Sequence, residues 1–575
     1  MSIIRPDRPI IHRQIPSRFE FENFSELDPV LTNLFAARGV KTTDELDYSL
    51  SNLAPVSSFA NIDKAASLLI SHRNEKIMIV GDFDVDGATS IALLMRCLSD
   101  FGFKNVDYLV PNRFKYGYGL SPKVVDIVAE HSPSLVVTVD NGISSIDGVA
   151  RAKELGIPVL ITDHHLPSND LPAAKVILNP NLKGEEFQSR NLAGVGVAFY
   201  LMARIGRMLE DNGEKDAAKI PAKYLDLVAL GTISDVVPLD HNNRILVEQG
   251  LIRIRAGKAV LGIKALLKLA GSEISQCVSA NLGFVIGPRV NAAGRLDDMS
   301  IGIKCLLTDC SDTADECANI LNVINLERRD IELAMKDQAF NYLDNFNENN
   351  LPDCICIYDK SWHQGVVGLI SAKVKEKYHR PVIAFAPDEK NLIKGSARSI
   401  PGVHIRDLIE AVSTCQPGLI EKFGGHAMAA GLTLKESSLD IFKKVISEKI
   451  QHLYPNADFS GAILIDGQLP GSLLNLDFAK LLRYISPWGT SFPEPTWSGD
   501  FKILEKRTVG DKHLKLRLKP IDTDDTVEAI AFNYEGNNIN GEVKLVYKLQ
   551  VNNFRNIERP QLLVEQIFSL NKEVA

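Results

Sequence analysis

The amino-acid sequence predicts an α/β protein: a parallel sheet with crossover helices, a long helix that joins it to a smaller α/β unit, and a C-terminal β-barrel. Three observations support this prediction. Short apolar runs alternate with helical stretches from about residue 75 to 240, a helical pattern occupies residues 313–346, and short alternating runs fill residues 459–575. The chain has 575 residues, and three or four domains are expected because about 150 residues make one domain.

The predicted parallel sheet rests on runs rich in Val, Ile and Leu that are bounded by Gly, Pro or Asp. These runs are "KIMIV", "VDYLV", "SLVVTV", "IPVLIT" and "AKVILN". Helical stretches such as "TSIALLMRCLSDF" and "KVVDIVAEH" lie between them. Strands that are buried on both faces have continuous apolar runs, which favours a parallel sheet. In such sheets ligands bind at the carboxyl ends of the strands.

The rest of the chain is expected to form a connecting helix and two further units. Thr313 and Glu316 have the spacing of a capping box, and apolar residues follow them at helical spacing. Next, "CICIYD", "VVGLISAKVKEKY", "PVIAFAP" and "LIKGSARS" begin a smaller α/β unit that ends near residue 455. The last part alternates apolar and polar residues, for example in "KHLKLRLK" and "EVKLVYKLQV". This pattern predicts a small β-barrel, with an OB-fold as the leading candidate.

The composition argues against several classes of protein. No uncharged apolar run is long enough to span a bilayer, and "MSIIRPDRPIIHRQ" lacks the apolar core of a signal peptide. A cytoplasmic protein that does not associate with a membrane is therefore expected. The eight cysteines form no C-x-x-C pair, which argues against a zinc site or a disulfide framework. The net charge of −8 argues against a wholly basic nucleic-acid binder but leaves room for a local basic groove.

Acidic residues recur where apolar segments end. In "VGDFDVDGAT", Asp82, Asp84 and Asp86 lie at every second position after an apolar run. A solvated loop with a helix N-cap is the alternative interpretation of that stretch. Three further apolar segments that we expect to be strands, "SLVVTV", "IPVLIT" and "LGTIS", also end in such residues: Asp140; Asp163, His164 and His165; and Asp235. The recurrence at four segment ends favours one cluster of carboxylates and imidazoles.

Such a cluster requires cations. Carboxylates within a few ångströms of one another raise each other's pKa and resist ionising. Carboxylates with a few imidazoles and no thiolate suit Mn²⁺ or Mg²⁺. Two such ions, about 3.5–4 Å apart, clamp both the attacking and the leaving oxygen of a phosphoryl displacement. We therefore expect two Mn²⁺ or Mg²⁺ ions in this site.

An ordered set of motifs gives the chain a resemblance to a known family. "DHH" at 163–165, with "DFDVDG", "VDNG" and "SDVVPL", resembles the DHH phosphoesterase superfamily, and "GGHAMAAG" at 424–431 is similar to its accessory (DHHA1-type) domain. Within the superfamily, the RecJ family of single-stranded-DNA-specific exonucleases is similar over nearly the whole chain. The motifs that carry this narrower resemblance are "PNRFKYGYGL" (111–120), "GPRVNAAGR" (287–295), "WHQGVVGLISAK" (362–373) and "GSARS" (395–399).

The resemblance implies a role for each residue that matches these motifs. One metal ion would be held by Asp82, Asp84 and Asp140, and the other by Asp86, His164 and Asp235, with Asp140 bridging both. Asp140, His165 and Asp163 form the expected catalytic set. His165 would stabilise charge near the scissile phosphate, unless it is only a structural hydrogen-bonding residue, and Asp163 would fix a histidine tautomer. The expected substrate-binding residues are Arg113, Tyr118, Arg289, Arg295, Ser396, Arg398 and His426.

Simpler interpretations remain open for several of these positions. Arg113 could be an ordinary loop arginine, and Arg289 and Arg295 could pair with the neighbouring Asp297 or Asp298. Trp362 fits a core position as well as a functional one. Seven basic residues in the predicted barrel could track a single strand or form an ordinary solvated face: Lys502, Lys506, Arg507, Lys512, Lys515, Arg517 and Lys519.

The resemblance implies a metal-dependent exonuclease that degrades single-stranded DNA in the 5′→3′ direction to nucleotides, in DNA repair and recombination. The implied domains are an N-terminal segment (1–50), a DHH catalytic domain (51–310), a connecting helix (311–346), an accessory domain (347–457) and an OB-fold (458–575). A monomer that contacts single-strand-binding protein and other recombination proteins is expected. The alternatives are a small-substrate DHH phosphoesterase, against which the extra β domain argues, and a non-catalytic DNA-binding replication scaffold, against which the intact aspartates argue.

Overall fold

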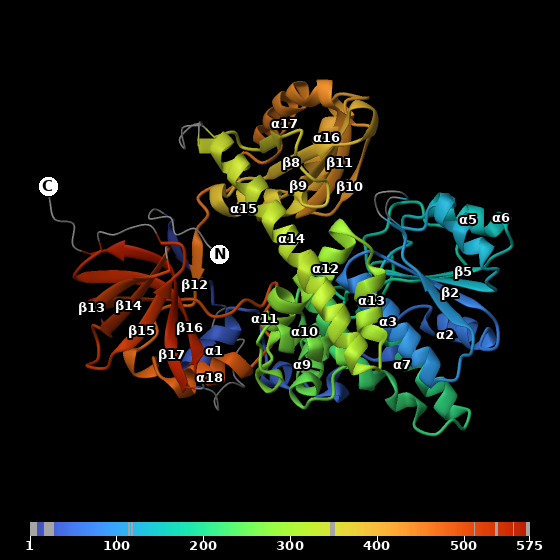
Figure 1. Ribbon diagram of the computed structural model, residues 1–575, viewed down its shortest axis with the longest axis horizontal. Coiled ribbons are helices and arrows are strands. Elements are labelled where there is room, and N and C mark those ends of the chain that lie inside the picture. The colour runs from blue at the N-terminus through green and yellow to red at the C-terminus, as the bar shows by residue number, and fades with distance from the viewer. Residues whose placement is uncertain are drawn as a thin grey trace.

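The computed structural model describes residues 8–15, 28–112, 116, 119–344, 351–510, 512–534, 539–555 and 557–570. It contains a first unit (residues 28–310), a second unit (residues 351–457) and a barrel (residues 497–569). Helix α14 (Ser311–Asp344) runs from the first unit to the second, and the barrel lies on the side of the first unit opposite the sheet (Figure 1). The predicted fold class is confirmed, because a parallel sheet, a long helix, a smaller α/β unit and a closed barrel follow one another.

The sheet of the first unit has five parallel strands in the order β3-β2-β4-β5-β6. The bounds are β2 Ile77–Gly81, β3 Val106–Leu109, β4 Leu135–Val139, β5 Val159–Thr162 and β6 Val176–Leu178. Every residue of β2, β4 and β5 is buried, which accounts for their continuous apolar runs. Strands β3 and β4 flank β2, so the order reverses between β2 and β4. Open α/β sheets bind ligands outside the carboxyl ends of the strands at such a reversal.

Helices cover both faces of this sheet. Helices α3 and α7 pack in the core on one face, and α5 and α6 pack on the other. A helical region with a π-helical turn (Leu282–Ile286) completes the unit. Its helices are α1 Pro29–Ala36, α2 Ile62–Ser71, α3 Val85–Asp100, α5 Pro122–Glu130, α6 Ile146–Glu154, α7 Gly194–Asp211, α8 Leu225–Ser234, α9 His241–Arg255, α10 Leu261–Leu269, α11 Ser279–Asn281, α12 Gly287–Leu296 and α13 Ser300–Leu307. Among the helices that the structure describes, none has the length and apolar character needed to cross a membrane.

The second unit is a mixed sheet covered by helices. The sheet has the order β10-β11-β9-β8-β7, and only the β7–β8 pair is parallel. The bounds are β7 Ile355–Tyr358, β8 Val382–Pro387, β9 Leu392–Arg398, β10 Lys422–Gly425, β11 Ala429–Lys435, α15 Val367–Tyr378, α16 Ile405–Cys415 and α17 Leu439–Leu453. The buried Trp362 donates its indole N–H to Gln338 of α14 at 2.8 Å. Trp362 is therefore a core residue that fastens the second unit to the connecting helix.

The C-terminal strands close into a barrel in the order β13-β14-β15-β17-β16. Their bounds are β13 Trp497–Val509, β14 His513–Pro520, β15 Val527–Ala531, β16 Glu542–Phe554 and β17 Ile557–Ser569. Strand β1 (Ile10–His12) pairs with β12 (Ile463–Ile465), and helix α18 (Leu476–Tyr484) packs against β16. The expectation of a small C-terminal barrel is confirmed.

The segment that leads into the barrel shares a core with the first unit. The ring of Phe35, on α1, lies 6.2 Å from the Trp488 ring and 6.3 Å from the Phe492 ring. Beside them Arg38 donates to Asp466 at 2.7 Å, and both of these side chains are buried. Aromatic packing of this extent fixes the barrel on the first unit.

Candidate metal centre and substrate cleft

The loop after β2 brings the first carboxylates to the point where the strand order reverses. Asp84 is the N-cap of α3, and its Oδ1 accepts a hydrogen bond from the Gly87 amide at 3.1 Å. The capping interpretation of this stretch is therefore correct for Asp84. A carboxylate oxygen of Asp84 nevertheless lies within 4.8 Å of ligand atoms of Asp82 and Asp140. One side chain thus caps the helix and contributes to the acidic cluster.

The start of helix α7 holds Asp86 in place. The amides of Gly194 and Val195 donate to the two oxygens of the Asp86 carboxylate at 2.6 and 2.9 Å. The N-terminus of a helix stabilises negative charge in this position. A Cβ on Gly194 would lie 2.6 Å from the Cβ of Asp140, so the close approach of α7 requires glycine.

Asp140 adopts a backbone conformation that is rare for a residue with a side chain. Its φ is +58°, in the left-handed region. The side-chain amide of the next residue, Asn141, donates to the carbonyls of Val80 and Val139 at 3.1 and 2.9 Å, and so joins the ends of β2 and β4. Backbone strain of this kind concentrates at functional sites, where the surrounding structure enforces it.

His164 lies among three carboxylates. Its Nε2 is 3.2 Å from Oδ1 of Asp140, 3.4 Å from Oδ2 of Asp235 and 3.8 Å from Oδ2 of Asp86. Asp235 reaches this position from the C-cap of α8. The expectation that Asp235 follows a strand is therefore wrong. Helix α8 is buried nearly all round, and the apolar run of such a helix cannot be told from that of a buried strand by its periodicity.

Asp163 organises the pair of histidines. Its Oδ1 accepts the amides of His164 and His165 at 2.7 and 3.1 Å and lies 2.7 Å from Nδ1 of His165. Burial alone would raise the pKa of Asp163, but the hydrogen bond and charge of His165 lower it to about 2. Burial alone would lower the pKa of His165, but Asp163 raises it to about 9. In the metal-free protein the imidazole of His165 is therefore a cation at neutral pH.

The remaining carboxylates resist ionisation, as the sequence led us to expect of an acidic cluster without cations. Burial, followed by the charge of Asp235, raises the pKa of Asp86 to about 7. Burial and the charge of Asp84 raise the pKa of Asp235 to about 8. Burial and the charge of Asp86 raise the pKa of Asp140 well above its ordinary value. Divalent cations would relieve this repulsion.

The donor atoms form groups that could each hold a cation. Within the described part of the chain, Nε2 of His164 and Oδ2 of Asp235 are buried and make no hydrogen bond. Three sets of donor atoms each lie within 4.8 Å of one another: Asp82, Asp84 and Asp140; Asp86, His164 and Asp235; and Asp140, His164 and His165. The first two sets are those that the sequence assigned to the two ions. Carboxylates and imidazole without thiolate fit Mn²⁺ or Mg²⁺.

The second unit reaches the same site through His426. The rings of His426 and His165 stack at 28° with their centroids 5.2 Å apart. Burial, followed by the positive charge of His165, lowers the pKa of His426 to about 4. A neutral imidazole of the second unit therefore faces a cationic imidazole of the first. The second unit therefore meets the first at the pair of histidines beside the acidic cluster.

An arginine site lies at the start of α15. Arg398 donates to Oγ of Ser396 at 3.2 Å and to the Ala397 carbonyl at 2.8 Å, and burial lowers the pKa of its guanidinium. A Cβ on Gly368 would lie 2.9 Å from Oγ of Ser396 and 3.1 Å from Nη2 of Arg398, so the first turn of the helix passes directly over both.

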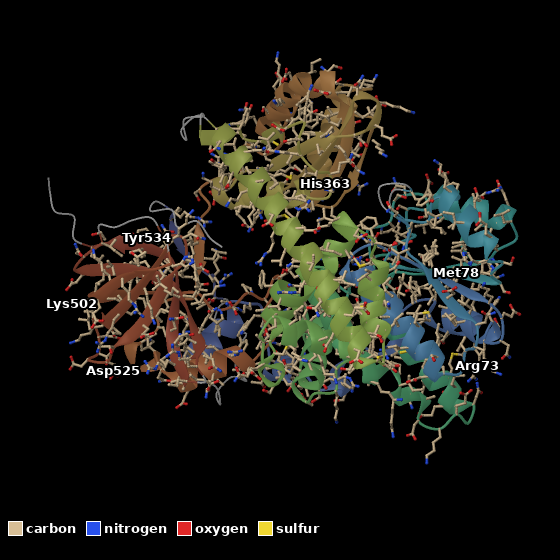
Figure 2. The ribbon with its side chains drawn as sticks, viewed as in Figure 1. Arg73, Met78, His363, Lys502, Asp525 and Tyr534 are labelled. Carbon is tan, nitrogen blue, oxygen red and sulfur yellow. The ribbon has the colours of Figure 1, made fainter. Side chains whose placement is uncertain are left out.

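Arg295 approaches the same helix from the first unit and donates to the Gly365 carbonyl at 3.3 Å. Figure 2 shows His363, in the loop before α15, on the side of the second unit that faces the first. Arg289 instead donates to Asn322 of α14 at 3.1 Å. The remaining two expected substrate-binding residues, Arg113 and Tyr118, lie outside the described residues.

Comparisons with known proteins identify the family. Residues 76–232 match the DHH family, N-terminal domain; residues 352–452 match the DHHA1 domain; and residues 465–566 match the RecJ OB domain. The single-stranded-DNA-specific exonuclease RecJ of Escherichia coli strain K12 is 46% identical over 558 residues, which cover 95% of this chain and 97% of that protein. The chain belongs to the RecJ family. RecJ of Bacillus subtilis strain 168 is 32% identical and covers 86% of this chain and 61% of its own length.

Solved structures of RecJ extend the comparison to metals. RecJ from Thermus thermophilus in complex with Mn²⁺ aligns with a TM-score of 0.81 at 26% identity and covers 98% of this chain and 79% of that one. The complex with Mg²⁺ has a TM-score of 0.75 at 25% identity, with coverage of 98% and 78%. The donor set of this RecJ-family chain suits both ions.

Sequence reasoning missed the groups that hold the RecJ site in shape. The amides of Gly194 and Val195 bind Asp86, and Asn141 joins two strand ends. Backbone amides leave no mark in a sequence. The only signal was the glycine-rich stretch "AGVGVA", which indicates a close approach without saying what approaches.

Proposed function

We propose that this protein is a metal-dependent exonuclease that hydrolyses single-stranded DNA in the 5′→3′ direction to nucleotides. One observation carries the proposal: two carboxylate-rich ligand sets lie at the strand-order reversal, and the second unit reaches them through His426, which stacks on His165. The same unit carries the half-buried arginine site of Arg398. The relatives named as single-stranded-DNA-specific exonucleases support the choice of substrate. Two divalent cations, when bound, supply an activated water and neutralise the charge of the phosphate.

The ligand sets divide the cations between two positions. Asp82 and Asp84 would hold one cation, and Asp86, His164 and Asp235 the other. Asp140 belongs to the first set and lies 3.2 Å from the His164 nitrogen of the second, so it is placed to be shared. The helix N-terminus on Asp86 and the cap on Asp84 keep these carboxylates oriented before any cation binds.

His165 and Asp163 act on the phosphate without holding a cation. Asp163 occupies Nδ1 of His165, so Nε2 remains as the nitrogen that donates to substrate. Asp163 raises the pKa of His165 to about 9 before any cation binds, so the ring is prepared to donate a hydrogen bond from Nε2 to a phosphate oxygen. A preoriented donor of this kind stabilises charge that develops on the phosphate oxygens.

The arginine site would recognise the 5′ end. Arg398, Ser396 and Arg295 converge on the first turn of α15. A guanidinium grips a phosphate with two parallel hydrogen bonds, and a terminal phosphate carries more charge than an internal one. A strand held by its 5′ phosphate places the adjoining phosphodiester over the cations, which accounts for the 5′→3′ direction. Arg113 and Tyr118 complete this proposal as further strand contacts.

The proposal assigns a task to each part of the chain. Residues 51–310 would perform hydrolysis, 347–457 would close the cleft through the helix at 311–346, and 458–575 would hold the strand, with residues 1–50 as an N-terminal segment. We propose that the protein works as a monomer in the cytoplasm, in DNA repair and recombination. Single-strand-binding protein and other recombination proteins would be its partners.

A degradation assay tests the proposal. The protein is incubated with Mn²⁺ and with single strands labelled at either end, with duplex DNA and with a dinucleotide. We expect the 5′ label to be released as mononucleotide from the first cuts, while the 3′ label stays in progressively shorter strands, with duplex resistant. Asp140→Ala, which removes the shared ligand, should abolish the activity. Cutting of the dinucleotide alone would support a small-substrate phosphoesterase, and binding without cutting would support a scaffold.

A further inference from the structure

The connecting helix α14 exposes a row of apolar side chains. Val323 is 54% exposed, Leu333 52%, Leu326 49% and Ile320 37%. Their spacing along the chain places them within an arc of about 140° of an α-helix, along about 20 Å of its length. Figure 1 shows this helix running from the first unit up to the second. A continuous apolar row on the surface, unlike single exposed apolar residues, indicates a surface that binds something.

The opposite side of α14 is already used by the fold. Leu321 packs in the core of the first unit, whereas Met335 and Ala339 pack in the core of the second. The helix therefore fastens both units with its buried side. The exposed row lies alongside the stretch in which the helix passes from one core to the other.

The exposed row is directed away from the metal centre. Arg328 is buried and, with Ser234, lines the space next to the ligand Asp235. Leu326 precedes Arg328 by two residues, which corresponds to about 200° around an α-helix. The side chain of Leu326 is accordingly exposed. A strand held over the metal centre therefore does not reach this row.

Negative charge accompanies the apolar row. Three exposed carboxylates that form no ion pair with any residue that the structure describes lie among it: Glu316, Glu327 and Asp330. The accessible basic residues on this part of the helix are Arg329, at the edge of the row, and Lys336, whose ammonium lies 3.7 Å from the Asp337 carboxylate. Negative charge therefore predominates. It disfavours both DNA and a second copy of the same surface, because like charges repel.

The spacing of the row suits a second helix as its partner. Val323 and Asp330 are seven residues apart, and so are Leu326 and Leu333. These pairs have the spacing of a and d positions in a coiled coil, where a facing helix inserts its side chains between them. Glu327 then takes an e position, where charged residues select the partner. A facing helix with apolar residues on one side and Lys or Arg beside them would complement this surface.

We propose that this face of α14 docks an amphipathic, basic helix of a partner protein. Its apolar side would cover Val323, Leu326 and Leu333, and its Lys or Arg residues would pair with Glu327 and Asp330. The inference goes beyond the proposed function and does not depend on it, because neither the metal ligands nor the arginine site takes part. A helix bound across the passage between the two cores would also limit the relative motion of the two units.

Binding of a synthetic helix tests the inference. The probe is a fluorescent peptide about four heptads long, with Leu at a and d, Lys at e and g and Ala elsewhere. Leu326→Ala/Leu333→Ala should weaken its binding at least about tenfold, because two buried apolar contacts are lost. Glu327→Lys/Asp330→Lys should weaken it at least about fivefold and should strengthen binding of a matched peptide with Glu in place of Lys. Fluorescence anisotropy measures both affinities.

Each test variant has a control with the same chemical change elsewhere. Ile441→Ala/Leu453→Ala truncates two exposed apolar side chains on α17. Glu410→Lys/Glu448→Lys reverses two exposed carboxylates on α16 and α17, with the same change in net charge. Both controls should bind the two peptides as the parent protein does. The test variants should keep the parental melting temperature and the parental affinity for a single-stranded oligonucleotide, because the substituted side chains are exposed and lie away from the metal centre.

Four results would overturn the inference. The first is a parent protein that does not bind the Lys peptide, and the second is a pair of test variants that bind it as their controls do. Self-association of the parent protein in sedimentation, abolished by Leu326→Ala/Leu333→Ala, would assign the face to a second copy. Weaker binding of the oligonucleotide by this variant would assign the face to the strand. The degradation assay tests the proposed function separately, so a failure of one is distinguished from a failure of the other.

Discussion

Arg398 is the residue that we propose distinguishes a strand end from internal backbone. It is half-buried, and its neighbours in the site are the small residues Ser396, Ala397 and Gly368. Charge-assisted hydrogen bonds contribute about 1.5–3 kcal/mol each. Arg398→Ala should therefore lower turnover of 5′-phosphorylated strands at least about tenfold, since about 1.4 kcal/mol corresponds to a factor of ten.

The comparison that checks this prediction uses matched strands with a 5′ phosphate or a 5′ hydroxyl. The hydroxyl strand never makes the full contact, so its initial rate should fall much less. Binding of Mn²⁺ should be unaffected, because Arg398 is not among the ligand sets. Equal losses on the two strands would mean that Arg398 holds the strand or the second unit in general and does not sense the end.

The acidic cluster predicts that the stability of the metal-free protein depends on pH in an unusual way. Folding raises the pKa of Asp86 to about 7 and that of Asp235 to about 8, from about 3.9 for an unfolded Asp. Between these pKa values the folded state therefore binds more protons than the unfolded state. Its stability falls as the pH rises from the unfolded pKa of about 3.9 to the folded pKa values of about 7 and about 8. Bound cations should remove the effect, because they stabilise the ionised carboxylates.

Thermal melts with EDTA and with Mn²⁺ between about pH 6 and about pH 8.5 measure this dependence. The gap between the two melting temperatures should widen as the pH rises. Asp235→Asn, which keeps the shape but cannot ionise, should reduce the widening. A gap that is constant across the range would show that the carboxylates do not repel one another in the folded protein.

The sequence identified the chemical residues far better than the groups that position them. Carboxylates and histidines such as Asp82 and His164 stand out because their charge contrasts with apolar surroundings. Asp235 lies in the acidic cluster, as expected, but it follows a helix and not a strand. The apolar run of a helix that is buried nearly all round cannot be told from that of a buried strand by its periodicity.

At the scale of elements, local patterns predicted whether a segment is a helix or a strand more reliably than they predicted the residues at which it begins and ends. The apolar runs of the sheet became strands β2 to β6. The capping-box spacing at Thr313 suggested the start of the long helix, whereas α14 begins at Ser311, where the Ala314 amide already bonds to the Cys310 carbonyl at 3.0 Å. The distance between two elements is not readable from one sequence, because it depends on residues far apart in the chain.

Helix α12 packs closely on residues 82–84, the proposed metal-binding loop. Its position should therefore affect how the carboxylates of that loop are oriented. A Cβ on Gly294 would lie 1.8 Å from the carbonyl oxygen of Phe83, between Asp82 and Asp84. Gly294→Ala must therefore displace that loop, and overpacking of this kind costs about 1–3 kcal/mol. We expect Mn²⁺ affinity to fall by about 10- to 100-fold, the effect of disturbing residues that orient metal ligands. Calorimetric titration with Mn²⁺, well below the melting temperature, measures it.

Gly262→Ala provides the matched control for this prediction. A Cβ there would lie 2.1 Å from the Cys305 carbonyl oxygen, a similar clash between α10 and α13 that does not involve the metal-binding loop. It should lower the melting temperature without changing Mn²⁺ affinity. If the two variants bind Mn²⁺ equally well, the packing of α12 does not set the geometry of the ligands.

At the scale of the whole molecule, the barrel and the first unit behave as one body. Trp488 and Phe492 pack on Phe35, and Arg38 pairs with Asp466. A chain shortened to remove the barrel would expose this aromatic cluster, and lost activity would then reflect lost stability. Substitutions on the barrel surface are the better test of its role in binding DNA.

Ion pairs reduce the positive charge that the barrel offers to a strand. Lys515 pairs with Glu528 at 2.7 Å, Arg517 with Glu505 at 3.0 Å and Lys519 with Asp524 at 2.6 Å. Arg507 and Lys512 are exposed near the hairpin that joins β13 and β14, and neither forms an ion pair with a residue that the structure describes. Tyr534, whose amide bonds to the Lys512 carbonyl at 2.9 Å, marks the upper edge of the barrel in Figure 2.

The unpaired residues should therefore account for the barrel's contribution to binding. Each phosphate neutralised on a single strand contributes about 0.7 to the slope of log K against log salt. The double variant Arg507→Ala/Lys512→Ala should lower that slope by about 1.4 on a long oligonucleotide if each residue contacts one phosphate. Lys515→Ala should lower it less, because its ammonium already pairs with Glu528. Anisotropy titrations across a salt series in the Asp140→Ala background measure both, and an equal reduction in the two variants would show that ion pairing on the barrel does not decide which residues meet the strand.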